Sequence, residues 1–226
     1  MVKPVKKIEV HRTDEQLKTA TDDVFLDKAY DARNYVMQNI ERFKKYGYYI
    51  AFVAVAIVAY FMYNSEINKE ANSQLGIAMI DIRTENFDKA EEKLTILIDE
   101  YSGTEAADRA TYLLGKILLN KGLIQAAKDR FSAYRGSDPL FTPAAQAGLA
   151  LCYEKEKNYQ AAAELYEKAA GNESRFELVA SYLFAAGVNY ELAKDNASAK
   201  SVYQNLIENH DNFSKKAIVE MKLKQL

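Results

Sequence analysis

The side chains that could do chemistry are present, but they are not arranged for it. Adjacent carboxylates occur at Glu91-Glu92 and Asp99-Glu100, and paired carboxylates can act as general acid and base. On amphipathic helices, however, such pairs usually form solvated faces. The sequence contains no glycine-rich phosphate loop and no Cys/His set with metal-binding spacing. We therefore predict that the chain is not an enzyme and needs no cofactor; a hidden active site would require a polar pocket with converging titratable groups.

The composition limits the kinds of fold and partner. Cys152 is the only cysteine, so no intrachain disulfide can form, and its apolar setting (LALCYE) is typical of a small buried side chain. The formal net charge of −2 indicates no nucleic-acid surface. Proline is absent from residues 5–138, which suits long helices. We expect an all-helical domain that is stable through packing alone.

One stretch of the chain, residues 46–65 (YGYYIAFVAVAIVAYFMYNS), carries no charge. As a helix it would be about 30 Å long, the thickness of the hydrocarbon core of a bilayer. Tyrosines stand at both of its ends, as in the aromatic belts of membrane helices. A buried core helix is the alternative, but core helices rarely stay uncharged on every face over this length. We predict a single transmembrane helix.

The charges beside this stretch predict its orientation. The fifteen residues before it contain Arg33, Arg42, Lys44 and Lys45, whereas the fifteen after it contain only Lys69. Because positive charge stays on the cytoplasmic side, we expect the N-terminus inside and the C-terminal domain outside. A cleaved signal peptide is the weaker interpretation, since forty-five residues precede the stretch. The two histidines, His11 and His210, would then lie on opposite sides of the membrane and could not act together.

Residues 24–45 predict a helix that leads into the membrane. Its apolar residues recur every three or four positions and form one stripe; they are Phe25, Ala29, Ala32, Val36, Ile40 and Phe43. The stripe could lie on the inner leaflet, pair with a second copy, or bind another membrane protein. It could also be the ordinary stem of the transmembrane helix.

The C-terminal part of the chain is a repeat. Four alanines lie 37, 35 and 37 residues apart; a small residue precedes each by twelve positions, and a bulky one follows each by four. The small residues are Ala78, Gly115, Ala150 and Gly187, the alanines are Ala90, Ala127, Ala162 and Ala199, and the bulky residues are Leu94, Phe131, Tyr166 and Tyr203. This order of residue types resembles the tetratricopeptide repeat, a helix–turn–helix unit of about 34 residues. The first copy departs most, because Asp81 replaces a tyrosine.

The resemblance implies an all-α solenoid. Small residues would let the two helices of a unit cross closely, and the bulky residue would fill the space against the next unit. The turns within units are expected at Glu85-Asn86, Lys121-Gly122, Lys157-Asn158 and Asp195-Asn196. Residues 214–226 are expected to form a cap helix. We predict a cytoplasmic tail over 1–45, a transmembrane helix over 46–65, and a tetratricopeptide-repeat-like domain of about four helix pairs plus the cap helix over 66–226.

In this family the first helix of each pair lines a concave protein-binding surface. The corresponding residues here are Leu75, Met79, Ile82, Tyr112, Lys116, Leu119, Ala147, Leu151, Glu154, Phe184, Val188 and Glu191. Some relatives hold an acidic C-terminus in a Lys/Asn clamp, but Leu75 and Met79 stand where its first residues would be. A helix or an extended apolar peptide fits this mainly apolar set better. Alternatively, several of these side chains pack between units or against the C-terminal helix.

The layout as a whole resembles the ancillary subunit family of the SecYEG translocon. That resemblance rests on the basic patch that ends the cytoplasmic tail (Arg42, Lys44, Lys45), the single span and the repeat domain beyond it. It implies a bacterial inner-membrane protein with a periplasmic domain, whose partners are translocon subunits, periplasmic chaperones or exported chains. The tail over residues 1–45 is longer than the resemblance predicts, which leaves its cytoplasmic partners open.

Two functions fit this layout. The first is a membrane-anchored adaptor or chaperone-like subunit beside the translocon, in which anchoring raises the effective concentration of the binding surface near the membrane. The alternative is a cell-envelope scaffold that assembles one stable partner complex through its repeats. A homo-oligomer is compatible with both.

Overall fold

The computed structural model describes residues 27–210 and 212–226. The chain divides into two compact units between Met62 and Tyr63, and each is described by itself. The regular structure of the described residues is helical throughout.

The described part of the first unit, residues 27–62, consists of two helices. One covers residues 27–38, and α2 (Ile40–Arg83) begins after a turn at Asn39 and continues into the second unit. The stripe predicted over 24–45 is thus shared by two helices, and residues 24–26 lie outside the described residues. At the end of the helix over 27–38, the backbone N–H of Asn39 is shared between the carbonyl oxygens of Tyr35 and Val36, each at 3.2 Å, as is common at helix ends.

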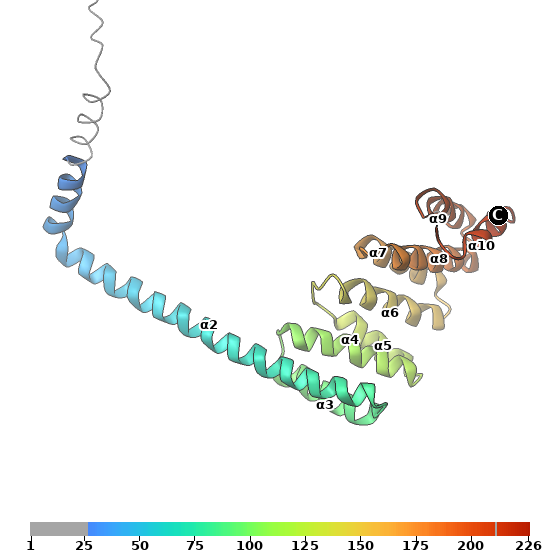
Figure 1. Ribbon diagram of the computed structural model, residues 1–226, viewed down its shortest axis with the longest axis horizontal. Coiled ribbons are helices and arrows are strands. Elements are labelled where there is room, and N and C mark those ends of the chain that lie inside the picture. Colours follow the sequence, from blue (N-terminus) through green and yellow to red (C-terminus); the bar gives the residue numbers. More distant parts are fainter. Residues whose placement is uncertain (1–26, 211) are drawn as a thin grey trace, which may run out of the picture. The chain divides into compact units, whose positions relative to one another are not determined.

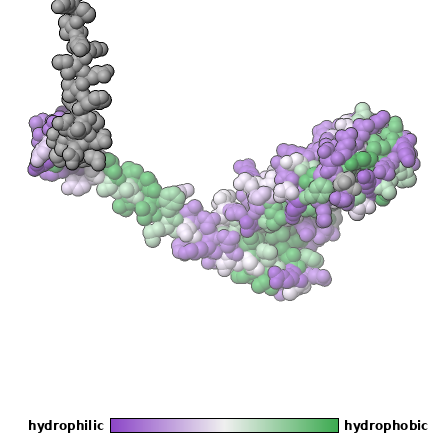
Figure 2. Space-filling view, turned by 45° about the horizontal axis from the view of Figure 1, so that its top comes forward, coloured by the Kyte–Doolittle hydropathy of each residue, from purple (hydrophilic) through white to green (hydrophobic). Residues whose placement is uncertain are grey.

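The uncharged stretch forms part of α2. All of its residues in the first unit, 46–62, are exposed, and they appear in Figure 2 as a band of hydrophobic surface along the helix. Among the described residues, α2 is the one helix that is long and apolar enough to cross a bilayer, as judged by length and composition.

The second unit, residues 63–226, is a row of helix pairs. The end of α2 pairs with α3 (Phe87–Glu100), and a cap helix, α10 (Lys216–Leu223), ends the row. The pairs between them are α4 (Glu105–Asn120) with α5 (Ile124–Ala133), α6 (Phe141–Lys155) with α7 (Tyr159–Asn172), and α8 (Phe176–Ala193) with α9 (Asn196–Asn209). From α3 to α10 each helix contacts the next one in the chain, as Figure 1 shows. The predicted all-α repeat array is confirmed.

The residues that revealed the repeat form the core. All four small residues, all four alanines and all four bulky residues are buried. A Cβ atom on Gly115 would lie 3.0 Å from the Phe131 ring, and one on Gly187 would lie 2.3 Å from the Tyr203 ring. In each of these two pairs, the two helices approach so closely that only a residue without a side chain leaves room for the aromatic ring.

In every repeat, the turn within the helix pair has a residue with a positive φ at the same position. Glu85, Gly122, Lys157 and Lys194 have φ values of 61°, 76°, 62° and 64°, which is the left-handed region that favours glycine. Three of the turns lie where they were predicted. In the fourth, Asn196 already belongs to α9, because Asp195 caps that helix and accepts a hydrogen bond from the Ser198 backbone N–H at 3.1 Å.

In the first repeat an ion pair replaces an aromatic contact. Asp81 on α2 pairs with Lys93 on α3 at 2.5 Å, in place of the tyrosine that the repeat pattern predicts. Because the Asp81 side chain is mostly buried, its charge is stabilised through Lys93.

Candidate protein-binding face

The residues predicted to bind a partner lie on the first helices of the four pairs, a surface that we call the A-helix face. Its members differ in exposure. Met79 is 44% exposed and Lys116 is exposed, whereas Leu75 is buried in the core. The other members are half-buried: Ile82, Tyr112, Leu119, Ala147, Leu151, Glu154, Phe184, Val188 and Glu191.

The accessible part of the A-helix face belongs to the first two repeats. Met79 and Lys116 occupy equivalent positions on α2 and α4, and Ile82 and Leu119 stand three residues after them. Within residues 27–210 and 212–226, Lys116 forms no ion pair. This part of the face therefore offers apolar side chains beside an unpaired cation.

Tyr112 is part of an aromatic cluster between repeats two and three. Its ring centroid lies 5.3 Å from that of Phe141 and 6.1 Å from that of Phe131. The guanidinium of Arg109 lies over the Phe141 ring at 5.5 Å and pairs with Asp138 at 2.9 Å. Burial raises the pKa of the Tyr112 hydroxyl. Tyr112 thus joins successive first helices and presents only part of its ring.

The A-helix face of the fourth repeat is largely covered by the chain itself. The Phe184 ring lies 5.9 Å from that of Phe213, and the Nζ of Lys215 lies 4.7 Å from the Phe184 ring centroid. Glu191 forms an ion pair with Lys222 of α10 at 2.7 Å. Phe184 and Glu191 therefore hold the C-terminal segment in place.

Glu154 is likewise engaged within the chain. It accepts a hydrogen bond from the Asn189 side-chain amide at 3.0 Å and one from the Tyr166 hydroxyl at 3.4 Å. Asn189, which is buried, also donates to the Ala185 carbonyl oxygen at 2.9 Å. Burial raises the pKa of Tyr166. This network links α6, α7 and α8 and engages one carboxylate oxygen of Glu154, Oε2, within the chain.

Sequence reasoning missed three residues that organise this face: Phe141, Phe213 and Asn189. A signal for two of them exists in the sequence, because Phe141 follows Tyr112 and Phe213 follows Phe184 by the same 29 residues. Asn189 gives no such signal. It is a polar residue in an otherwise apolar helix, and nothing in the sequence indicates that its hydrogen-bond partner is Glu154.

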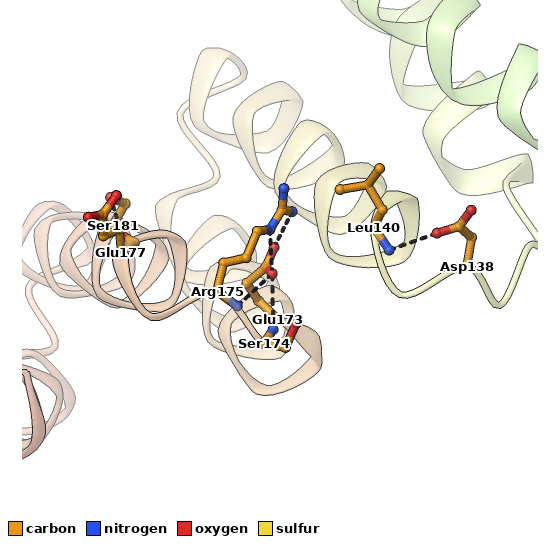
Figure 3. A network of polar contacts seen from close by, with 7 residues as sticks. All are labelled: Asp138, Leu140, Glu173, Ser174, Arg175, Glu177 and Ser181. Carbon is orange, nitrogen blue, oxygen red and sulfur yellow. Dashed lines mark hydrogen bonds and ion pairs between the residues drawn. The ribbon is translucent and has the colours of Figure 1, made fainter.

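A buried carboxylate organises the loop between α7 and α8. One oxygen of Glu173 accepts from the backbone N–H groups of Ser174 and Arg175 at 3.0 and 2.9 Å and from Arg175 Nε at 2.8 Å, while its other oxygen accepts from Arg175 Nη2 at 2.6 Å. Figure 3 shows Arg175 folded back onto this carboxylate. The hydrogen bonds and charge of Arg175 lower the pKa of Glu173 to about 2.

Replacing Glu173 by glutamine is expected to lower the free energy of unfolding at neutral pH by about 1–2 kcal/mol, because Arg175 loses a charged partner. The folded pKa of about 2 lies below the ordinary 4.5, so the stabilisation is present above pH 4.5 and is lost as the pH falls through about 2. Denaturation measured across this window should therefore show a weaker pH dependence in Glu173→Gln. Glu92→Gln, at an exposed position in the middle of α3, is the matched control and should change neither quantity.

The residues considered for chemistry do not form a site in the described part of the chain. Cys152 is buried, and burial raises the pKa of its thiol to about 11, so the reactive thiolate is disfavoured at neutral pH. His210 packs against Phe176, with ring centroids 4.6 Å apart and ring planes tilted by 42°, and His11 lies outside the described residues. No group of three or more potential metal ligands occurs among the residues that the structure describes.

Comparisons with known proteins agree with this architecture. One tetratricopeptide repeat model matches residues 75–140 and 112–175, and a second matches residues 181–212. No curated protein matches the chain. Both models describe the tetratricopeptide repeat alone, so they do not support the predicted membership in the ancillary subunit family of the SecYEG translocon.

Two solved structures are similar in fold. They are crystal structures of the nearly identical TPR-like repeats of a candidate kinesin light chain from Podosopora anserina, one of them carrying a single substitution. Each is 15% identical to this chain, covers 70% of it and 85% of its own length, and has a TM-score of 0.54. At this identity the likeness shows the fold alone. Because the two repeat models together cover more than half of the sequence, the chain belongs to the tetratricopeptide-repeat family.

Proposed function

We propose that this protein is a membrane-anchored adaptor that binds other proteins through the A-helix face of its first two repeats. Tetratricopeptide repeats point to a protein-binding role. The observation that carries the narrower proposal is the exposure of Met79 and Lys116 on equivalent positions of α2 and α4. The fourth repeat is a poorer candidate, since Phe184 and Glu191 already contact the C-terminal segment.

The chemistry of this surface favours a particular kind of partner. Met79 and the half-buried Ile82 and Leu119 supply an adaptable apolar contact, and Lys116 supplies a cation without an ion-pair partner among the described residues. A helix or an extended segment with apolar side chains and one nearby carboxylate would complement both features. Such contacts exchange readily, as a chaperone-like subunit requires.

The proposed location follows from α2 and the charges before it. The uncharged stretch over 46–65 would cross a bacterial inner membrane once, with the N-terminus cytoplasmic and the repeat domain periplasmic. Confinement near the membrane would raise the effective concentration of the A-helix face for translocon subunits, periplasmic chaperones or exported chains. Weak contacts would then suffice for binding.

The second candidate is a cell-envelope scaffold that assembles one stable complex. The observation in its favour is a pair of exposed apolar residues on the last helix: Ile218 is 42% and Met221 is 53% exposed. A stable partner seated at this end of the row would cover them.

Photo-crosslinking in cells tests the proposal and separates the two candidates. A photoreactive residue at Met79 or Lys116 is expected to capture translocon subunits, chaperones or exported chains. The matched controls are Gln125 and Gln160, which are exposed on the second helices α5 and α7. Capture from the control positions alone would contradict the proposed face, and a single stoichiometric adduct at every position would favour the scaffold.

Reversing the charge of the face should weaken binding. We expect Lys116→Glu combined with Met79→Glu to weaken the affinity for a captured partner about tenfold or more, because it removes an apolar contact and repels the partner's carboxylate. The measurement is titration of the purified partner by fluorescence anisotropy. Gln125→Glu combined with Gln160→Glu adds the same side chains on α5 and α7 and should leave the affinity unchanged.

A further inference from the structure

We propose that the helix over residues 27–38 lies on the membrane surface, with its apolar side in the lipid and Arg33 in contact with lipid phosphate. This inference rests on the proposed transmembrane helix. It names a second surface of the protein, distinct from the A-helix face, and commits it to a lipid partner.

The helix is amphipathic. At about 100° per residue, Ala29, Ala32 and Val36 share one side, and Met37 and Tyr30 lie between this side and the polar side. Polar residues occupy the opposite side; they are Asp27, Asp31, Asn34 and Gln38. The large apolar side chains are uncovered by the rest of the described chain, with Tyr30 59% and Met37 61% exposed. We expect apolar side chains exposed in this way to be buried against lipid or another protein.

The chain allows this helix to lie along the surface while α2 crosses the membrane. The helical hydrogen bonds close on Tyr35 and Val36 through the Asn39 backbone N–H, and the Asn39 side-chain amide also donates to the Tyr35 carbonyl oxygen at 2.9 Å. Asn39 is the one residue between the helix over 27–38 and α2, and in Figure 1 the chain changes direction between the first helix drawn and α2. A continuous helix would have had to follow the direction of α2.

The connection keeps this helix close to the bilayer. Only residues 39–45 separate its end from the start of the uncharged stretch, a rise of about 10 Å along a helix. Arg42, Lys44 and Lys45 lie in this connection, with Lys44 paired to Glu41 at 2.9 Å. Anionic lipid headgroups attract such a basic segment. The lipid surface is therefore close enough to bury the apolar side of this helix.

Arg33 favours lipid over a second copy of the chain. It lies at the margin of the apolar side, between Ala29 and Met37 on the helix circumference, and has no ion pair among the residues that the structure describes. If two copies packed these sides together, their Arg33 side chains would be brought into contact and would repel each other. At a lipid surface the same side chain can extend to a phosphate while its methylene groups stay in the apolar layer.

Site-directed spin labelling of the full chain tests this proposal. The protein carries Cys152→Ala and one nitroxide at Val36, Gln38 or Ala54, and is placed in nanodiscs of zwitterionic lipid with a minority of anionic phosphatidylglycerol. Collisions with oxygen report lipid, and collisions with a water-soluble nickel chelate report water. We expect the oxygen-to-nickel ratio to be several-fold higher at Val36 than at Gln38, which lies on the opposite side, and highest at Ala54.

The other outcomes separate the failure of this inference from that of the anchor. Equal aqueous exposure at Val36 and Gln38, with Ala54 in lipid, would overturn the inference and leave the anchor standing. An aqueous Ala54 would overturn both. Val36 shielded from both reagents would indicate protein contact and also overturn the inference; broadening that disappears on dilution with unlabelled protein would identify a second copy.

The role of Arg33 has its own test. Arg33→Glu is expected to lower the oxygen-to-nickel ratio at Val36 several-fold, because a carboxylate repels the phosphates that the arginine contacts. Asn34→Glu, on the polar side of the same helix, is the matched control and should leave the ratio unchanged. An unchanged ratio in Arg33→Glu would show that this arginine does not hold the helix to the lipid.

Discussion

Replacing Gly187 by alanine is expected to destabilise the fourth repeat by about 2–3 kcal/mol, the cost of overpacking a filled core. The added Cβ would lie 2.3 Å from Cε1 of Tyr203, well inside van der Waals contact. The ring has little room to move away, because Tyr203 is completely buried. One methyl group therefore forces α8 and α9 apart.

Amide hydrogen exchange of α8 and α9 in the full chain measures this effect, since local opening of a repeat array need not unfold the whole row. Gly171→Ala is the matched control: a Cβ at Gly171, on α7, would meet no atom within 4 Å. Alanine there should be neutral or stabilising by about 0.5–1 kcal/mol. Adding Tyr203→Leu to Gly187→Ala should restore part of the loss. Equal exchange in the two alanine variants would contradict the packing argument.

The same close approach explains why the fold could be predicted from the sequence. Each helix pair needs a small residue, an alanine and a bulky residue at fixed distances along the chain, and these are visible as residue types. Gly187 with Tyr203 and Gly115 with Phe131 are the clearest cases. Substitutions at such positions leave either a clash or a cavity, so the repeat pattern and the core are the same set of residues.

The backbone conformation of the turns was harder to predict from the sequence. Left-handed residues usually reveal themselves as glycine, yet Glu85, Lys157 and Lys194 adopt this conformation. Backbone hydrogen bonds at the helix end hold them there, as where the N–H groups of Lys157 and Asn158 donate to the carbonyl oxygens of Glu154 and Tyr153, both at 2.9 Å. Within these turns only Gly122 follows the usual preference. The interruption at Asn39 was likewise missed, because the apolar stripe of residues 24–45 continues through it.

The residue pattern identified the helices of the A-helix face but not which parts of it are free. That distinction depends on contacts between distant residues, such as Phe184 with Phe213 and Glu191 with Lys222. Where the cap helix would pack could not be read from the repeat, since α10 has no second helix to complete its own unit. The structure therefore moves the proposed binding region toward Met79 and Lys116.

Lysines at both Val55 and Val58 are expected to abolish membrane integration. Both valines are exposed on α2 within its uncharged stretch, and each central lysine costs about 2.5–3.5 kcal/mol on insertion. Together they should offset most of the gain from burying the apolar residues around them. The measurement is the fraction of the full chain that stays in the membrane pellet after carbonate extraction.

Asn72→Lys combined with Ser73→Lys is the matched control, because these residues are exposed on the same helix beyond the uncharged stretch. It adds equal charge outside the bilayer and should leave the protein in the pellet. If the Val55/Val58 variant also stayed there, α2 would not cross the bilayer, and the A-helix face would owe its location to another contact. Release of that variant alone would mean that the uncharged part of α2 holds the repeats at the membrane, as an anchored adaptor requires.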